Sequence, residues 1–337
     1  MARYRLTIAY DGTAFCGWQR QHMPVDLARA HGHDVDALPS APDGARVELR
    51  SVQSIVQRAI RAVTLEDVNL IGASRTDAGV HARAQTAAFS LPDERTRGPA
   101  DDRLADAINS KLPDDVLITR CARTNDDFDP ITHCIAKGYS YLFHVEHPRP
   151  LWDRAYVHHV REPLNAAAMH AAAALLVGTH DFAAFAASGH GRESTVRTVL
   201  HCAARESVSS FGERRIRIDI AADGFLWNMV RIVAGTLMDV GRGRLSIEDA
   251  RSALNSGDRR AAGPTVPPTG LCLEWGAYTE EELAARTTGV DVAPHLLDAV
   301  RASAAARRKR QSEWLAQGKG GVFHVEHPPG DLGSEDA

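Results

Sequence analysis

The chain has 337 residues, of which 44% are hydrophobic and 24% are charged, and its formal net charge at pH 7 is −4. This length accommodates two domains of ordinary size, and the charge excludes a protein that is basic over its whole surface. No run of about eighteen apolar residues occurs, and the five cysteines are widely spaced and odd in number. We therefore expect a cytoplasmic protein without a membrane span, a secretory signal or disulfides.

The first part of the chain predicts an α+β half over residues 1–122. Residues 3–10 alternate apolar and polar side chains, which is typical of a strand with one buried face. Ser51 precedes apolar residues at helical spacing, so we expect it to cap a helix. The elements predicted here are strands at 3–10, 68–71, 80–89 and from 116, and helices at 52–63 and 104–112.

One segment of this half lacks any periodic pattern. Residues 22–49 are rich in Pro, Asp, Ala and Gly. Such composition is typical of irregular chain, so we predict an inserted, mobile loop.

The same order of elements recurs over residues 123–280. The predicted strands are 137–145, 196–204, 214–222 and 271–275, and the predicted helices are 164–177 and 225–240. Two similar halves predict an α+β fold with a joined, largely antiparallel sheet and a cleft at the seam. The chain contains no Gly-x-Gly-x-x-Gly string and no Walker-type loop, which argues against a nucleotide-driven enzyme.

Residues 281–337 form an extension of different composition, rich in Ala, Arg, Glu and Gly. We expect one helix over 295–317 with a basic cluster at 307–310, which is either a solvated helix face or a contact for RNA phosphates. The string Phe-His-Val-Glu-His-Pro occurs at 143–148 and again at 323–328. We hypothesise that the second copy is an exposed strand that pairs with a sheet edge.

The stretch 71–89 holds the residues of greatest chemical interest. It predicts a strand, a loop and a strand, with Arg75 and Asp77 two positions apart in the loop. On an extended backbone this spacing would point both side chains to one side, and the guanidinium would keep the carboxylate ionised. An ionised carboxylate can act as a nucleophile or a base, whereas an ordinary surface ion pair would have the same pattern.

Four stretches together identify a resemblance that covers roughly residues 3–280. They are Tyr-Asp-Gly-Thr-Ala-Phe-Cys-Gly-Trp-Gln-Arg-Gln at 10–21, Ser-Arg-Thr-Asp-Ala-Gly-Val-His-Ala at 74–82, Lys-Gly-Tyr-Ser-Tyr at 137–141 and Asn-Met-Val-Arg-Ile-Val-Ala-Gly at 228–235. In this order they closely resemble the TruA family of tRNA pseudouridine synthases. The resemblance implies a pseudouridine synthase fold of two ferredoxin-like halves that share a sheet, acting as a homodimer.

The resemblance also implies an activity and its residues. The reaction is the isomerisation of uridine to pseudouridine at positions 38, 39 and 40 in the anticodon stem-loop of tRNAs, without a cofactor or a metal. By the match, Asp77 is the catalytic carboxylate, Arg75 its salt-bridge partner, Tyr139 the ring against the target base and Arg231 a second arginine of the cleft.

Three further residues are assigned from the pattern itself. Arg20, beside aromatic residues, suits a phosphate contact, and Leu271 at the start of the last strand is expected to close the pocket. His81 is expected to be a hydrogen-bonding residue of the loop.

Two other functions fit parts of the pattern. A tRNA-binding chaperone would not need Arg75, Asp77 and Tyr139, and a nucleoside hydrolase would normally need a second carboxylate, which no spacing supplies.

The chain departs from the family at Ile131, where an Arg is common, and in the long segment 22–49. These departures concern the RNA contacts more than the reaction.

Overall fold

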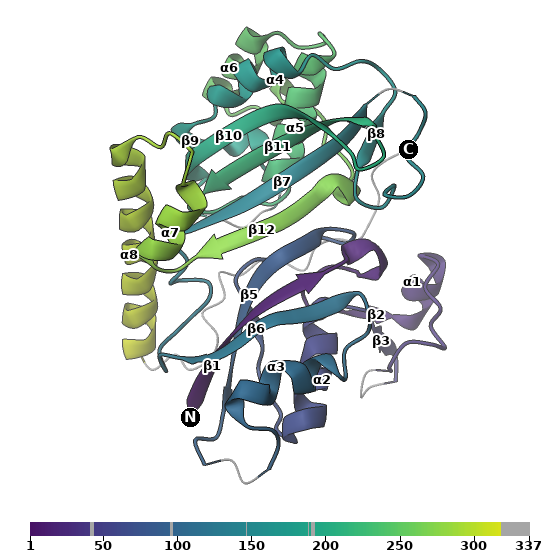
Figure 1. Cartoon of the computed structure of the whole chain (residues 1–337), viewed down its shortest axis with the longest axis vertical. Coiled ribbons are helices and arrows are strands. Elements are labelled where there is room, and N and C mark those ends of the chain that lie inside the picture. Colours follow the sequence, from purple (N-terminus) through teal and green to yellow (C-terminus); the bar gives the residue numbers. More distant parts are fainter. Residues whose placement is uncertain (41–43, 95–96, 146, 188, 190–192, 318–337) are drawn as a thin grey trace. The chain divides into compact units, whose positions relative to one another are not determined.

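A computed structural model describes residues 1–337 except 41–43, 95–96, 146, 188, 190–192 and 318–337 (Figure 1). The chain divides into two compact units. The first unit comprises Met1–Cys134 and Pro268–Gly276, and the second comprises Ile135–Pro267 and the residues from Ala277 onward. The sequence placed the boundary near residue 122; the units instead divide at 134, and the last predicted strand returns to the first unit.

The first unit contains four main strands in the order β6-β1-β5-β12, with β4 paired to β5. Their bounds are β1 Ala2–Tyr10, β4 Ile71–Gly72, β5 His81–Leu91, β6 Val116–Thr124 and β12 Leu271–Ala277. β1 is antiparallel to both of its neighbours, and the Tyr4 ring stacks on Phe89 of β5 with 5.4 Å between centroids. Every second residue of β1 is buried, which confirms the strand predicted from alternation at 3–10.

Two helices belong to this unit, α2 (Val52–Thr64) and α3 (Leu104–Asn109). The Ser51 side chain accepts a hydrogen bond from the backbone N–H of Ser54, so Ser51 is the predicted N-cap of α2. α2 packs against α3, and α3 packs against β6. Both predicted helices are therefore confirmed.

The segment 22–49 is not the irregular loop that its composition predicted. It contains β2 (His22–Pro24), α1 (Val25–Ala30) and β3 (Arg46–Glu48), and β2 and β3 are antiparallel. These elements surround a small core of their own, formed by Met23, Ala28, Val35, Val47 and Leu49. Strands of three residues and a helix of six are too short to show a hydrophobic period, so the sequence pattern missed them.

The second unit has a mainly antiparallel set of strands in the order β7-β11-β10-β9, with the short β8 parallel to β7. Their bounds are β7 Ala136–Val145, β8 His158–Val160, β9 Gly178–Asp181, β10 Val196–Val208 and β11 Arg214–Ala222. Ile216, Ile218 and Ile220 of β11 are buried, as their spacing predicted.

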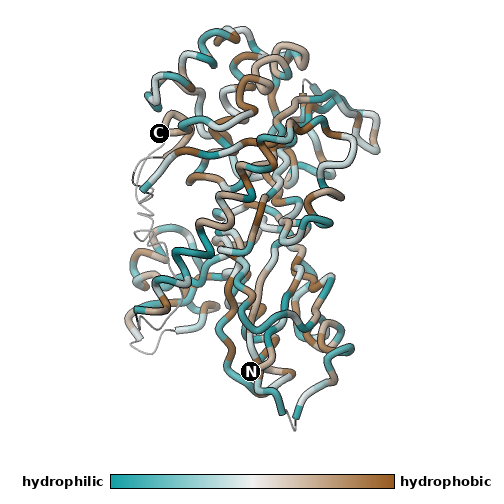
Figure 2. Tube along the Cα trace, turned by 90° about the vertical axis from the view of Figure 1, so that its left-hand side faces the viewer, coloured by the Kyte–Doolittle hydropathy of each residue, from teal (hydrophilic) through white to brown (hydrophobic). Residues whose placement is uncertain are grey.

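The helices of the second unit pack around its strands. They are α4 (Ala166–Ala174), α5 (Met229–Gly241), α6 (Ile247–Ser256), α7 (Glu280–Thr287) and α8 (Pro294–Ala316). α4 packs against β10 and α5, and α8 packs against β9 and β10. α8 buries Leu296, Val300 and Ala304 but is otherwise mostly hydrophilic, as Figure 2 shows from the side of this helix.

The antiparallel strands and packed helices of both units confirm the predicted α+β class. Short 3-10 helices occur at Gly12–Ala14, Asp101–Arg103, Ala183–Phe185, Arg259–Ala261 and Pro268–Gly270. Within the described part of the chain, no helix is both long and apolar enough to cross a membrane. The repeated hexapeptide at 323–328 lies outside the described residues.

Candidate active site

The loop between β4 and β5 carries Asp77, and its base is fixed by hydrogen bonds inside the first unit. The backbone N–H of Ala73 donates to the carbonyl of Thr86 at 2.8 Å. The fully buried amide of Gln85 bonds both polar backbone groups of Ser74, accepting from N–H at 3.2 Å and donating to the carbonyl at 2.5 Å. The Gln85 side chain thus takes the place of the backbone of a neighbouring strand, because it bonds one backbone donor and one backbone acceptor of the loop. No sequence pattern indicated this role.

The segment after β1 holds the same loop from a second side. The N–H of Trp18 donates to the Thr76 carbonyl at 3.0 Å, and the N–H of Gly79 donates to the Phe15 carbonyl at 3.2 Å. The hydroxyls of Tyr10 and Thr76 lie 2.7 Å apart. Because backbone groups make most of these contacts, the position of Asp77 is defined by the chain path itself.

Glycine is required where these two segments meet. Gly17 has φ +99°, and a Cβ atom there would lie 2.6 Å from the Thr76 carbonyl oxygen. A non-glycine residue would strain the backbone and push the Asp77 loop away.

His81, the first residue of β5, is a buried hydrogen-bonding residue. Its Nδ1 accepts from the N–H of Gly12 at 3.0 Å. The Asp11 carboxylate oxygen Oδ1 lies 3.2 Å from the same ring nitrogen.

Arg75 and Asp77 are not paired as their spacing predicted. Asp77 is partly buried and Arg75 is exposed. The Arg75 side chain makes no hydrogen bond or ion pair with any residue that the structure describes, and partial burial lowers the pKa of its guanidinium. The loop bends at this point, so the side chains at these positions do not follow the alternation of a strand.

The other candidates of the first unit lie on segments that border this loop. Leu271 is buried at the start of β12, one residue before Cys272, which pairs with His81 at the end of the loop. Arg20 follows Trp18 by two residues, and its guanidinium bonds the buried carboxylate of Glu48.

The second unit contains Tyr139 and Arg231. Tyr139 lies on β7 opposite Ile220 of β11, and its buried ring is nearly perpendicular to the ring of Phe225, with 5.0 Å between centroids. Arg231, in the first turn of α5, donates from Nε to the Val266 carbonyl and from Nη1 to the Asn228 side chain, both at 2.8 Å. Arg231 is thus oriented by two acceptors, one of which belongs to the αL residue Asn228 at the N-cap.

A second tyrosine, which the sequence analysis did not single out, supports Arg231. The Tyr141 hydroxyl donates to the Pro267 carbonyl at 2.8 Å, next to the carbonyl that Arg231 uses. Burial raises the pKa of Tyr141 well above its ordinary value, which keeps the hydroxyl a donor. The sequence could have indicated Tyr141, because residues two positions apart on a strand lie on the same face and Tyr141 is two positions from Tyr139.

The described residues contain no group of three or more His, Cys, Asp or Glu side chains arranged to hold a metal ion. The first unit offers a half-buried carboxylate in a backbone-fixed loop, and the second unit, by itself, offers an oriented arginine and a buried aromatic ring. A carboxylate of this kind can serve as a nucleophile or a base.

Comparison with known proteins gives a consistent result. A family model described as tRNA pseudouridine synthase matches residues 172–278. The chain is 37% identical over 278 residues to "tRNA pseudouridine synthase A" of Clostridium botulinum (strain Eklund 17B / Type B), and 39% identical over 273 residues to the protein of that name in Thermoanaerobacter sp. (strain X514). Each match covers 81% of this chain and 98% of the relative. A third protein of that name, from Pelobacter propionicus, is 39% identical over 277 residues.

Proposed function

Because the chain belongs to the tRNA pseudouridine synthase A family, and is therefore an isomerase, we propose that it converts uridine to pseudouridine at positions 38, 39 and 40 in the anticodon stem-loop of tRNAs. We assign Asp77 as the catalytic carboxylate. The observation that carries this assignment is the loop of Asp77, which hydrogen bonds from Trp18, Gly79 and Gln85 hold on both sides. A catalytic group that reacts with a single atom of its substrate must be held in a defined position, and these hydrogen bonds hold the loop in that way.

The proposed reaction breaks the bond between N1 of uracil and C1′ of ribose and forms a bond from C5 to C1′. C5 loses a proton and N1 gains one, so atoms and electrons balance without a redox agent, a hydrolytic water or a cofactor. Asp77 assists as a nucleophile or as a base toward the nucleoside. A base within a stem must first leave its stack, which costs a few kcal/mol.

The other candidates supply the RNA contacts in this proposal. The Tyr139 ring packs against the displaced base, while Arg231 provides an oriented positive charge. Arg75, whose guanidinium has no acceptor in the described part of the chain, is left for the RNA, and Leu271 closes the pocket. We further propose that the enzyme works in the cytoplasm as a homodimer.

Replacement of Asp77 by Asn tests the proposal. The amide keeps the size of the side chain but removes its negative charge, so pseudouridine formation should fall below detection while tRNA binding stays near the wild-type level. The measurement is chemical mapping of pseudouridine in an unmodified tRNA transcript after incubation with each purified protein.

A matched control is available on the surface of the same unit. Asp67→Asn makes the same chemical change at a carboxylate that is 79% exposed and pairs only with exposed Arg61, and it should retain full activity. Activity of purified Asp77→Asn would refute the assignment. Release of free uracil by the wild-type protein would instead identify a nucleoside hydrolase.

A further inference from the structure

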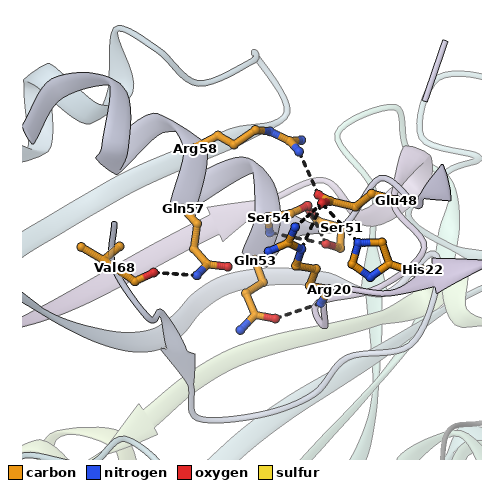
Figure 3. A network of polar contacts seen from close by, with 9 residues as sticks. All are labelled: Arg20, His22, Glu48, Ser51, Gln53, Ser54, Gln57, Arg58 and Val68. Atoms are coloured by element: carbon orange, nitrogen blue, oxygen red, sulfur yellow. Dashed lines mark hydrogen bonds and ion pairs between the residues drawn. The ribbon is translucent and has the colours of Figure 1, made fainter. Parts of the chain in front are cut away.

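Glu48 is a buried carboxylate at the point where the segment 22–49 rejoins the first unit. Only 7% of its side chain is exposed, and it lies among Arg20, Arg58 and His22 (Figure 3). One oxygen, Oε2, accepts from Arg20 Nη2 at 2.7 Å and Nε at 3.0 Å, and the other, Oε1, accepts from Arg58 Nη1 at 2.8 Å. His22 Nε2 is 3.8 Å from Oε2.

This carboxylate stays ionised although it is buried. Burial alone would raise the pKa of Glu48, but the Ser54 hydroxyl and the guanidiniums of Arg20 and Arg58 outweigh it and hold the pKa below its usual value. One negative charge therefore lies between two positive ones, and the cluster has a net positive charge even with neutral His22.

The two guanidiniums keep unused donors. Arg20 directs Nε and Nη2 at Glu48, and Arg58 directs only Nη1 there. For Arg20 Nη1 and for Arg58 Nε and Nη2, no acceptor exists among the residues that the structure describes. The side chains are 50% and 52% exposed, so these donors are available to an external anion.

Glu48 also brings the arginines closer together than their charges would otherwise allow. Two free guanidiniums repel each other, and long exposed side chains sample many rotamers. The carboxylate that they share reduces the repulsion between the guanidiniums and restricts their rotamers before a ligand binds. Paired guanidiniums with free N–H groups suit the oxygens of a phosphate.

The cluster is fixed to the segment that holds the Asp77 loop. The backbone N–H of Arg20 donates to Gln53 Oε1 at 2.8 Å, and the N–H of Gln53 donates to the Trp18 carbonyl at 3.0 Å. Trp18 in turn donates to the Thr76 carbonyl. These hydrogen bonds fix the position of the cluster relative to the loop of Asp77, so a ligand bound to the cluster has a defined position relative to that loop within one unit.

We propose that Arg20 and Arg58 form a pre-organised site for a backbone phosphate of the RNA substrate, and that Glu48 is the positioning residue that assembles it. This inference rests on the proposed function, because it takes tRNA as the ligand. It gives the segment 22–49 a role, since β3 of that segment supplies Glu48.

The first test removes one arginine. Arg58→Gln should weaken binding of an unmodified tRNA transcript about tenfold and reduce the slope of log Kobs against log salt by about one. The loss should appear in KM for tRNA rather than in kcat. Arg61→Gln is the matched control on the same helix, because Arg61 is exposed and pairs with Asp67, and it should leave both quantities unchanged.

The second test uses the sign of an effect. A diffuse positive patch would bind tRNA more tightly once the negative charge of Glu48 is removed, whereas an assembled site would bind it more weakly. We expect Glu48→Gln to weaken binding severalfold, while Asp67→Asn leaves it unchanged or slightly tighter. Thermal unfolding of each variant shows whether the fold is kept. If Glu48→Gln unfolds, the binding measurement on Arg58→Gln tests the proposal instead, because Arg58 is exposed and its replacement should not affect folding.

Unchanged tRNA affinity and salt slope in Arg58→Gln, or tighter binding by folded Glu48→Gln, would overturn the proposal.

A third experiment, with inorganic phosphate alone, distinguishes an RNA site from a site for small anions. We expect it to leave the melting temperature of the wild-type protein unchanged, and an increase that Arg58→Gln abolishes would contradict an RNA site. Pseudouridine formation by the wild-type protein is measured in parallel. Its absence would reject the proposed function, whereas its presence with a neutral Arg58→Gln would reject only this site.

Discussion

The candidate residues of the two units are held in different ways. In the first unit, backbone groups of Trp18, Gly79 and Thr76 fix the loop of Asp77, and a glycine stands at the closest approach. In the second unit, Arg231 is fixed through its own side chain, by the Val266 carbonyl and the Asn228 amide.

This difference predicts which substitutions each region tolerates. A loop clamped by its backbone keeps its position when a side chain is changed, but it cannot accept an added Cβ at a close approach. A charged side chain held by its own hydrogen bonds loses its orientation when the donor geometry changes, even if the charge stays.

The largest effect is expected at the clamp of the first unit. Gly17→Ala places a Cβ 2.6 Å from the Thr76 carbonyl oxygen at φ +99°. We expect a loss of about 3 kcal/mol in the free energy of unfolding, together with a loss of activity, because the displaced loop carries Asp77. Urea denaturation and the pseudouridine assay measure the two losses.

Gly212→Ala is the matched control for this experiment. Gly212 has φ +80°, but among the described residues, its two chain neighbours aside, no atom lies within 4 Å of its ideal Cβ position, so this variant carries the strain of the positive φ without the clash. If both variants lost the same stability, the close approach of Gly17 to the loop would not matter.

The next effect in size tests the side-chain clamp of the second unit. Arg231→Lys keeps the charge but cannot reproduce the fork that reaches Val266 and Asn228. We expect kcat/KM to fall by roughly tenfold to a hundredfold, which is about 1.4 to 2.7 kcal/mol, with only a small change in melting temperature.

Arg301→Lys provides the comparison. Arg301 is exposed on α8 and pairs with Glu280 and Asp298, where a lysine is an adequate substitute, so activity should be unchanged. Wild-type activity of Arg231→Lys would show that its charge alone is sufficient.

The same contrast explains what the sequence could predict. Alternation along β1 and the apolar period of α2 involve many residues, so those elements were predicted with nearly their observed bounds. The loop around Asp77 was predicted by its flanking strands and by its motif. These are local signals, and they depend on residues close in sequence.

The parts that the sequence did not predict depend on distant partners or on very few residues. Gln85 serves Ser74 through the pairing of a loop with a strand, and Glu48 meets Arg20 across 28 positions of the chain. The expected pair of Arg75 and Asp77 is absent because the loop does not continue the strand geometry. Neither α1 nor the two short strands beside it contain enough turns or alternations to be recognised.

The smallest effect concerns how the extension after residue 280 supports the second unit. The buried carboxylate of Asp223 follows β11 directly; its Oδ1 accepts from the N–H of Thr198, and its Oδ2 accepts from the Ser303 hydroxyl of α8 at 2.7 Å. Ser303→Ala removes that donor from a mostly buried acceptor. We expect a loss of about 1 kcal/mol in the free energy of unfolding, measured by urea denaturation.

Ser312→Ala separates this contact from an effect on the helix itself. The Ser312 hydroxyl bonds only the Arg308 carbonyl within α8, so its removal should change stability by less than about 0.5 kcal/mol. Because Asp223 begins the turn that leads to Phe225 and Arg231, Ser303→Ala should also lower activity slightly if α8 orients that turn. Equal stability of the two serine variants would mean that α8 contributes through its apolar residues Leu296, Val300 and Ala304 rather than through Ser303.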